Sequence, residues 1–294
     1  MRISTEIGSI AKYIGEERAI HYVAEAGFDC FDFTMLAMAQ YSYATHSYVP
    51  NDHPLGSPNY LSYVRHLRQV AEECGITCNQ SHAPFPVFCP EIRDMLKRAI
   101  ECTAEAGGKI CVIHPNNHKT AEENREMFLE LLTFAESYGI KIATENMWNW
   151  SPELDHAITA ACSHHDDFVS HIDVVGHPSF GACLDIGHAE MKGLGTSAPQ
   201  MIHALGHRLI ALHLHDNDRW HDSHMVPFAG QIDFRAVIEA LLDVGYAGDF
   251  TLEADKHFSM NKGENPQKLI AEMADSARRL VALYETVKGE KGVV

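Results

Sequence analysis

The sequence predicts an α/β fold, a (β/α)8 TIM barrel that forms a single domain over residues 1–294, and three observations support this prediction. Short apolar runs alternate with longer segments of helical periodicity, as in the repeated βα units of a parallel sheet. Eight such units follow one another without a linker rich in Gly, Ser or Pro. Several predicted helices are followed by a glycine (Gly27, Gly75, Gly139, Gly245), where a left-handed residue ends a helix before the next strand.

The first half of the chain contains four of these units. Each predicted strand is a short run rich in Ile, Val, Phe or Cys, and each predicted helix places apolar residues three or four positions apart. In chain order the strands and helices are 3–7, 15–26, 28–33, 59–74, 76–80, 91–106, 110–113 and 121–138.

The second half repeats the pattern with four further units. Its strands and helices are predicted, in order, at 141–144, 152–166, 181–184, 198–203, 209–214, 234–244, 249–252 and 266–288. A doubly wound sheet is the structural alternative, but that fold normally carries a glycine-rich phosphate loop after an early strand. The chain contains no GxGxxG sequence, so the barrel is favoured.

The segment 41–58, YSYATHSYVPNDHPLGSP, is rich in aromatic, His and Pro residues. We expect it to be an extended loop that lies over the barrel mouth as a lid or binding loop, because loops of this length are often functional. A surface insertion without function is the alternative.

Composition limits the partners and the compartment. The formal charge of −17 disfavours binding to nucleic acid or to an anionic membrane surface. The eight cysteines form no CxxC pair and lie mostly in apolar stretches, so we expect reduced thiols. The first residues lack a signal-peptide pattern and no apolar run is long enough to span a bilayer, so we expect a cytoplasmic protein.

Nine side chains that can bind a metal lie at or after the ends of predicted strands. They are His82, His114, Glu145, Asp185, His188, His213, Asp222, His224 and Glu253. The carboxyl ends of barrel strands converge on one face, so residues far apart in the sequence meet there. One such residue alone is more often structural, but their occurrence at successive strand ends predicts an active site.

The motifs that carry these residues are SHAP, IHP, TEN, CLDIGH, HLHD, DSH and LEAD. Together they resemble the xylose isomerase-like TIM-barrel superfamily, which holds sugar isomerases and epimerases as well as endonuclease-IV-type AP endonucleases. The resemblance covers nearly the whole chain. In its ketose 3-epimerase branch it implies substrate contacts by His188 and Arg219. It also implies one divalent metal ion held by Glu145, Asp185, His213 and Glu253.

The chemistry of this quartet agrees with that implication. Three carboxylates and one imidazole suit Mn²⁺, Co²⁺ or Mg²⁺, and Zn²⁺ can also bind. Such an ion chelates sugar oxygens and stabilises the enediolate that forms when a proton next to a carbonyl is removed. We therefore expect a sugar isomerase or epimerase in which Glu145 and Glu253 are the catalytic proton-transfer pair. Residues expected to contact the substrate or to support the metal ligands are His82, His114, His188, His215, Arg219, Asp222, His224 and Trp148.

Two other enzyme classes stay open. An endonuclease-IV-like phosphodiesterase binds three zinc ions through nine ligands, and each ligand has a candidate among the nine residues above. A keto-inositol dehydratase-type lyase is the other alternative. The acidic composition argues against a DNA substrate, and the segments 41–58 and 148–152 contain no Lys or Arg that could grip phosphates.

The expected substrate is a small unphosphorylated sugar or a polyol-derived keto compound. The strand-end segments offer few cations for a phosphate beyond Arg219, Lys256 and Lys262. Two positions depart from the epimerase pattern. Ser151 stands where a second Glu commonly follows the metal Glu, and Pro227-Phe228 replaces the usual Pro-Gly after the DxH motif. Substrate contacts near these positions should therefore differ, and the sequence leaves a homo-oligomeric state open.

Overall fold

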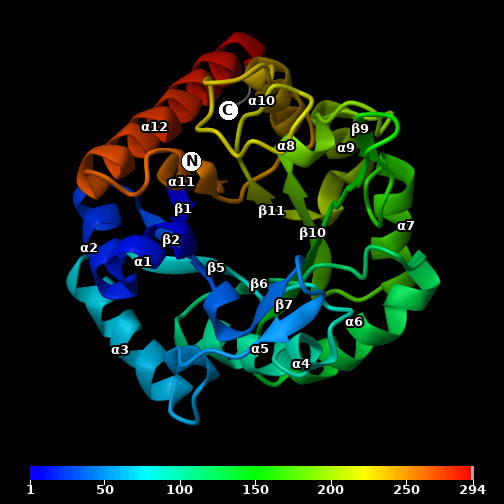
Figure 1. Cartoon of the computed structure of the whole chain (residues 1–294). Helices are drawn as coiled ribbons and strands as arrows, with labels where there is room; N and C mark the ends of the chain where they lie inside the picture. The colour runs from blue at the N-terminus through cyan, green and yellow to red at the C-terminus, as the bar shows by residue number, and fades with distance from the viewer. Residues whose placement is uncertain (293–294) are drawn as a thin grey trace.

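Within residues 1–292, which this computed structural model describes, eight parallel strands form a ring surrounded by helices (Figure 1). The ring strands are β1 (Ile3–Glu6), β2 (Cys30–Thr34), β5 (Thr77–His82), β6 (Ile110–Val112), β7 (Lys141–Glu145), β10 (Phe180–Asp185), β11 (Leu209–His213) and β12 (Phe250–Leu252). Their order is β11-β10-β7-β6-β5-β2-β1-β12. A parallel bridge between Leu214 and Leu252 joins the two outermost strands and closes the barrel.

The long helices cover the outside of the ring, because each presents an apolar face to the strands. They are α2 (Glu16–Glu25), α3 (Tyr60–Glu73), α5 (Leu96–Glu105), α6 (Ala121–Glu136), α7 (His165–Val175), α9 (Ala198–Leu205), α10 (Phe234–Asp243) and α12 (Pro266–Lys291). In α6, a capping box between Thr120 and Glu123 satisfies the first N–H groups, and Phe128 and Leu131 are buried. The eight-stranded ring and the helices around it confirm the predicted (β/α)8 fold.

Shorter elements occupy the connections. They are α1 (Gly8–Ile14), α4 (Pro90–Arg93), α8 (Ile186–Ala189) and α11 (Asp255–Met260), with 3-10 turns η1 (Leu36–Met38), η2 (Pro54–Gly56) and η3 (Gly206–Arg208). All eight cysteines are free, in agreement with the prediction of reduced thiols. Among the described helices, none combines the length and the apolar character needed to cross a membrane.

The inside of the ring holds an apolar layer and a polar one. Small buried side chains make the apolar layer: Val112, Ala143, Cys183 and Ala211. In the polar layer, Ser4 Oγ donates a hydrogen bond to Asn79 Oδ1 at 2.8 Å, and Asn79 Nδ2 donates to Thr251 Oγ1 at 3.0 Å. Gln80 Nε2 donates to Asp32 Oδ2 at 2.9 Å. These bonds satisfy polar groups that burial would otherwise leave without partners.

The helix predicted over 152–166 is wrong, because residues 152–158 belong to a hairpin and helical structure begins only at His165. β8 (Asn149–Ser151) pairs antiparallel with β9 (His156–Ile158), and Asp155 takes a left-handed conformation with φ of 51° at the turn. The helix of this unit, α7, begins only at His165, where the side chain of His164 accepts a hydrogen bond from the Asp166 N–H. Its buried face is formed by Phe168, Ile172 and Val175, at helical spacing.

The segment 41–58 also contains a hairpin where an extended loop was predicted. β3 (Gln40–Ser42) pairs with β4 (Ser47–Val49), and the blue hairpin lies in front of the lower part of the ring in Figure 1. Tyr41 packs edge-on against Phe88 from the loop after β5, with ring centroids 5.6 Å apart. The segment therefore lies over the barrel mouth as predicted, but as a paired hairpin.

Two substitutions distinguish the observed α7 from the predicted helix. Phe168→Ala should lower the free energy of unfolding by about 3–5 kcal/mol, because the fully buried ring leaves a cavity. Leu154 lies within the predicted helix, but its side chain is exposed. Leu154→Ala should therefore change the free energy of unfolding by less than about 0.5 kcal/mol. Chemical denaturation measures both values, and losses of equal size would contradict the structure.

Candidate metal and active site

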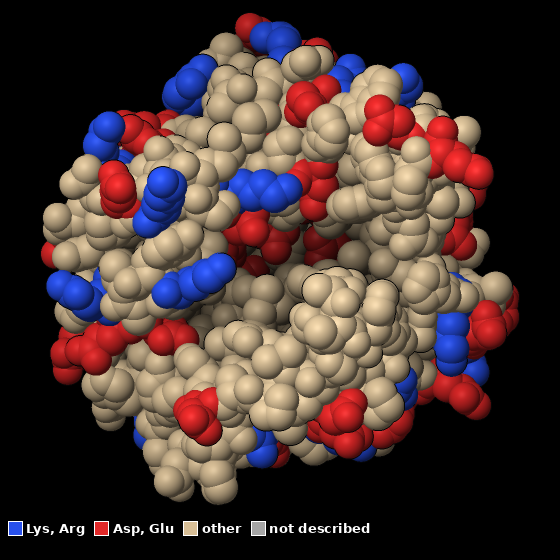
Figure 2. All heavy atoms as spheres, in the orientation of Figure 1, with Lys and Arg blue, Asp and Glu red and all other residues tan. Residues whose placement is uncertain are grey.

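All nine side chains singled out in the sequence lie at the carboxyl ends of the ring strands. His82, Glu145, Asp185 and His213 are the last residues of β5, β7, β10 and β11. The remaining five follow β6, β10, β11 and β12 in the chain: His114, His188, Asp222, His224 and Glu253. Figure 2 looks onto this face and shows a hollow with acidic side chains on its floor and Lys and Arg side chains along part of its rim.

Glu145 is the carboxylate that joins most of the imidazoles. Glu145 is buried, with only 1% of its surface exposed. Glu145 Oε1 lies 3.1 Å from His213 Nδ1, while Oε2 lies 3.1 Å from His114 Nε2 and 3.3 Å from His82 Nε2. A buried carboxylate without such partners would be strongly destabilising, so these contacts hold the three strand ends together.

Four residues lie close enough together to bind one divalent cation. One ligand atom each from Glu145, Asp185, His213 and Glu253 lies within 4.8 Å of the others. Asp185 Oδ2 is buried, and no described residue offers it a hydrogen bond, which leaves this oxygen able to bind a cation. Three carboxylates and one imidazole suit Mn²⁺, Co²⁺, Mg²⁺ or Zn²⁺. The quartet expected from the sequence therefore fits one divalent metal.

The two glutamates of the quartet have opposite pKa shifts. Burial raises the pKa of Glu253 to about 8; the charge of Glu145 adds to this shift and that of His213 opposes it. Burial also acts to raise the pKa of Glu145, but the charge of His213 and hydrogen bonds from His114, His213 and His82 hold it well below its ordinary value. At neutral pH one carboxyl is thus ionised and the other is protonated, an arrangement suited to acid and base roles.

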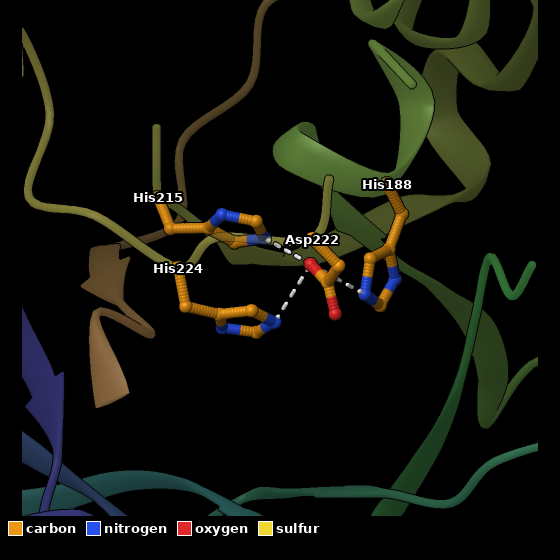
Figure 3. A group of neighbouring side chains, drawn as sticks. All are labelled: His188, His215, Asp222 and His224. Carbon is orange, nitrogen blue, oxygen red and sulfur yellow. Dashed lines mark ion pairs between the residues drawn. The ribbon is translucent and has the colours of Figure 1, made fainter. Parts of the chain in front are cut away.

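A second group, which we call the Asp222 cluster, comprises His188, His215, Asp222 and His224 (Figure 3). Asp222 Oδ1 lies 3.0 Å from His224 Nε2, 3.5 Å from His188 Nε2 and 3.7 Å from His215 Nε2. Burial opposes the charged form, but the charges of His224 and His188 keep the pKa of Asp222 well below its ordinary value. Asp222 is thus an anion held between imidazoles.

A glycine is required beside this cluster. His215 Nε2 lies 3.0 Å from Asp185 Oδ1, which connects the Asp222 cluster to the quartet. The imidazole of His215 packs so closely on Gly187 that a Cβ there would lie 1.9 Å from His215 Cε1. The glycine of the CLDIGH motif therefore makes room for this imidazole.

Two buried residues that the sequence analysis did not single out position the predicted ones. Asp32, in the middle of β2, places Oδ2 3.3 Å from His213 Nε2, so His213 can direct Nδ1 toward Glu145 and Glu253. Asn146 accepts a hydrogen bond from Asp185 N–H at 2.8 Å and donates one to Asp185 C=O at 2.9 Å. A signal for Asp32 was present, because a charged residue between two phenylalanines of a buried strand points into the barrel.

Arg219 and Trp148 lie at the edge of the site. Arg219 Nη2 pairs with Glu190 Oε2 at 2.8 Å and its side chain is half exposed, so the guanidinium lies apart from the clustered groups. The indole of Trp148 lies 6.3 Å from the His188 ring and packs against Met191 and Leu194. Trp148 therefore borders the Asp222 cluster, while Arg219 is held by a carboxylate outside it.

Asp32→Asn should weaken metal binding without unfolding the protein. Asn keeps the shape of Asp but loses the charge that fixes the orientation and basicity of His213, so affinity for Mn²⁺ should fall by about 10–100-fold. Calorimetric titration measures the affinity. Asp173→Asn, which removes a surface partner of Arg208, is the matched control and should leave it unchanged. Wild-type affinity in Asp32→Asn would contradict the role of Asp32.

Metal affinity should rise with pH, because bound protons must leave the ligand atoms first. Glu253 has a pKa of about 8. Burial opposes the charged form of His213, but nearby negative charges, including those of Glu253 and Glu145, raise its pKa well above the ordinary value. Both groups are protonated at pH 6, and Glu253 loses its proton as the pH rises through 8. Titrations with Mn²⁺ between pH 6 and 9, in buffers of different ionisation enthalpy, should show proton release and rising affinity. An affinity for Mn²⁺ that does not change between pH 6 and 9 would contradict this prediction.

Comparison with known proteins places the chain in a family. A family model described as xylose isomerase-like TIM barrel matches residues 20–280. An uncharacterized protein of Methanocaldococcus jannaschii is 28% identical over 215 residues, which cover 67% of this chain and 70% of that protein.

Two solved structures share the fold over nearly their whole length. A D-tagatose 3-epimerase-like protein has a TM-score of 0.69 and 22% identity, with both chains fully covered. The IolI protein, solved with a zinc atom, has a TM-score of 0.68 and 17% identity, and the match covers 97% of this chain and 99% of that one. Since the family model spans most of the chain and the barrel agrees with it, the protein belongs to the xylose isomerase-like TIM barrel family.

Proposed function

We propose that the protein is a divalent-metal-dependent sugar isomerase or epimerase. The observation that carries this proposal is the pair Glu145 and Glu253, whose carboxylates lie 3.1 and 3.2 Å from the same atom, His213 Nδ1. Before a metal binds, the pKa values of the two carboxyls are displaced in opposite directions, so the two groups differ in proton affinity. The solved structures named above, an epimerase-like protein and a zinc-containing barrel, support the same class.

In this proposal the two glutamates act on the carbon next to the substrate carbonyl. Glu145 removes the proton from that carbon, and Glu253 supplies a proton in return through the carboxyl oxygen that does not bind the metal. A Mn²⁺, Co²⁺, Mg²⁺ or Zn²⁺ ion held by Glu145, Asp185, His213 and Glu253 would stabilise negative charge on the substrate oxygens. Asp32 keeps His213 oriented. Glu145 is buried, while 16% of the Glu253 side chain is exposed.

The other predicted residues surround this pair and are proposed to hold the substrate. His82 and His114 face Glu145, while His188, His215, Asp222 and His224 form a polar wall that Trp148 borders. Arg219 can reach a substrate only if it leaves Glu190. The acidic floor of the hollow in Figure 2 favours an uncharged sugar or polyol-derived ketone over a phosphorylated one and over nucleic acid.

Exchange of a sugar hydrogen with solvent tests the proposal. Incubation of ketoses and aldoses with the Mn²⁺-loaded protein in D₂O should place deuterium at the carbon next to the carbonyl. Glu145→Gln and Glu253→Gln should each slow this exchange by about 10²-fold or more, because a proton-transfer group contributes about that much. Gln200→Glu, on the outer helix α9, is a charge-changing control that should retain the rate. Exchange that persists in both active-site variants would remove the acid and base assignment.

A second candidate, a multi-zinc phosphodiesterase, is favoured by one specific observation. The nine strand-end residues, together with His215, form overlapping groups that could each hold an ion, among them His82 with His114 and Glu145, the quartet, and the Asp222 cluster. The net charge of −17 opposes a DNA substrate. Metal analysis of the purified protein separates the two candidates. About one ion per chain agrees with the isomerase, whereas three tightly bound zinc ions and cleavage of abasic-site DNA would overturn it.

A further inference from the structure

A cavity of about 280 Å³ lies beside the quartet at the barrel mouth. Four segments that follow ring strands enclose it: the turn of the β3–β4 hairpin, the loop after β5, the loop after β6 and the start of the connection after β7. His114 is the residue shared by this cavity and the candidate active site, because its Nε2 also lies 3.1 Å from Glu145 Oε2. Neither Glu145 nor Glu253 lines the cavity.

Aromatic rings form a large part of the wall of this cavity, beside the imidazoles of His46, His114 and His118. Phe85 stacks on His114, with ring centroids 4.4 Å apart and planes 20° apart. Tyr43 and Phe88 both pack edge-on against Tyr41, at 5.1 and 5.6 Å. Among the described residues that line the cavity, none is Asp, Glu, Lys or Arg, although acidic side chains form the floor of the adjacent hollow. The cavity therefore offers neither the Lys or Arg that a phosphate group would require nor a carboxylate for a cationic group.

Two of these aromatic residues are exposed although they are held in place. Tyr43 is 59% exposed and Phe88 is 42% exposed. Large exposed apolar side chains that border a pocket mark a binding surface, because a bound group removes their area from water. Their edge-on packing on Tyr41 fixes the rings, so a bound planar group would meet a preformed surface.

We propose that this cavity binds an uncharged aromatic substituent of the substrate. The inference rests on the proposed function and makes the substrate an aryl-substituted sugar that also carries a ketone, such as an aryl glycoside with a keto group on its ring; simple aryl glycosides are then unreactive ligands that report on binding alone. The reacting carbon must lie at Glu145 and Glu253, so a group that fills the cavity lies beyond it, past His114. The size agrees, because an apolar cavity of about 150 Å³ already binds benzene.

Matched pairs of phenyl and methyl glycosides test this site without turnover. Calorimetric titration of glucose and galactose pairs into the Mn²⁺-loaded protein should show at least one pair in which the phenyl glycoside binds about tenfold more tightly, equivalent to about 1.4 kcal/mol. Tyr43→Ala and Phe88→Ala should each bring that pair to within about twofold. Tyr138→Ala is the matched control, since Tyr138 is also 42% exposed but bonds to Glu101 outside the cavity. It should keep the full preference.

Equal affinities in the wild type, or no binding of any pair, would overturn the proposal. A phenyl preference that survives in both Tyr43→Ala and Phe88→Ala would also overturn it, as would its loss in Tyr138→Ala. Thermal melts check that each variant is folded. The proposed function fails separately, because the absence of solvent deuterium exchange would remove the isomerase while a phenyl preference that depends on Tyr43 and Phe88 would still support an aryl site.

Discussion

The arrangement of the site depends on the hydrogen bonds and positive charges that stabilise one buried carboxylate, Glu145. A carboxylate removed from water is tolerated only among groups that donate hydrogen bonds or carry positive charge. One oxygen of Glu145 faces His213, and the other faces His82 and His114. The carboxyl ends of β5, β7 and β11 and the loop after β6 are thereby linked through a single side chain. Glu253 shares His213 with Glu145. Burial and the negative charge of Glu145 nevertheless raise the pKa of Glu253, so the two carboxyls differ in proton affinity.

The ring strands could be predicted because their signal is local. Strands such as β7 and β10 are short apolar runs that end at a polar residue, and burial on both sides requires this composition. The region 152–166 could not be predicted in the same way. Its apolar residues are compatible with a helix, but the left-handed turn at Asp155 and the pairing of β8 with β9 depend on contacts with the rest of the barrel mouth. The helix α7 begins after His164, whose side chain accepts a hydrogen bond from the Asp166 N–H.

The candidate site shows the same division. The members of the quartet follow strand ends in sequence order, so the fold alone brings them to one face. The inward direction of Asp32 is visible from its place between two phenylalanines, but its contact with His213 depends on how β2 and β11 face each other across the barrel. Asn146 similarly depends on the neighbouring end of β10. The position of Arg219 depends on Glu190, a contact that the spacing of the HLHD motif does not reveal.

The two hairpins at the barrel mouth have a consequence for how this protein can diversify. In the described part of the chain, β3 pairs only with β4, and β8 pairs only with β9. Within residues 1–292, neither hairpin therefore forms hydrogen bonds with the strands of the barrel. Mutations in them leave the hydrogen bonds of the scaffold intact. During evolution the sequences of these hairpins can therefore change to suit a new ligand, while the strand-end residues of the active site and the barrel itself stay the same.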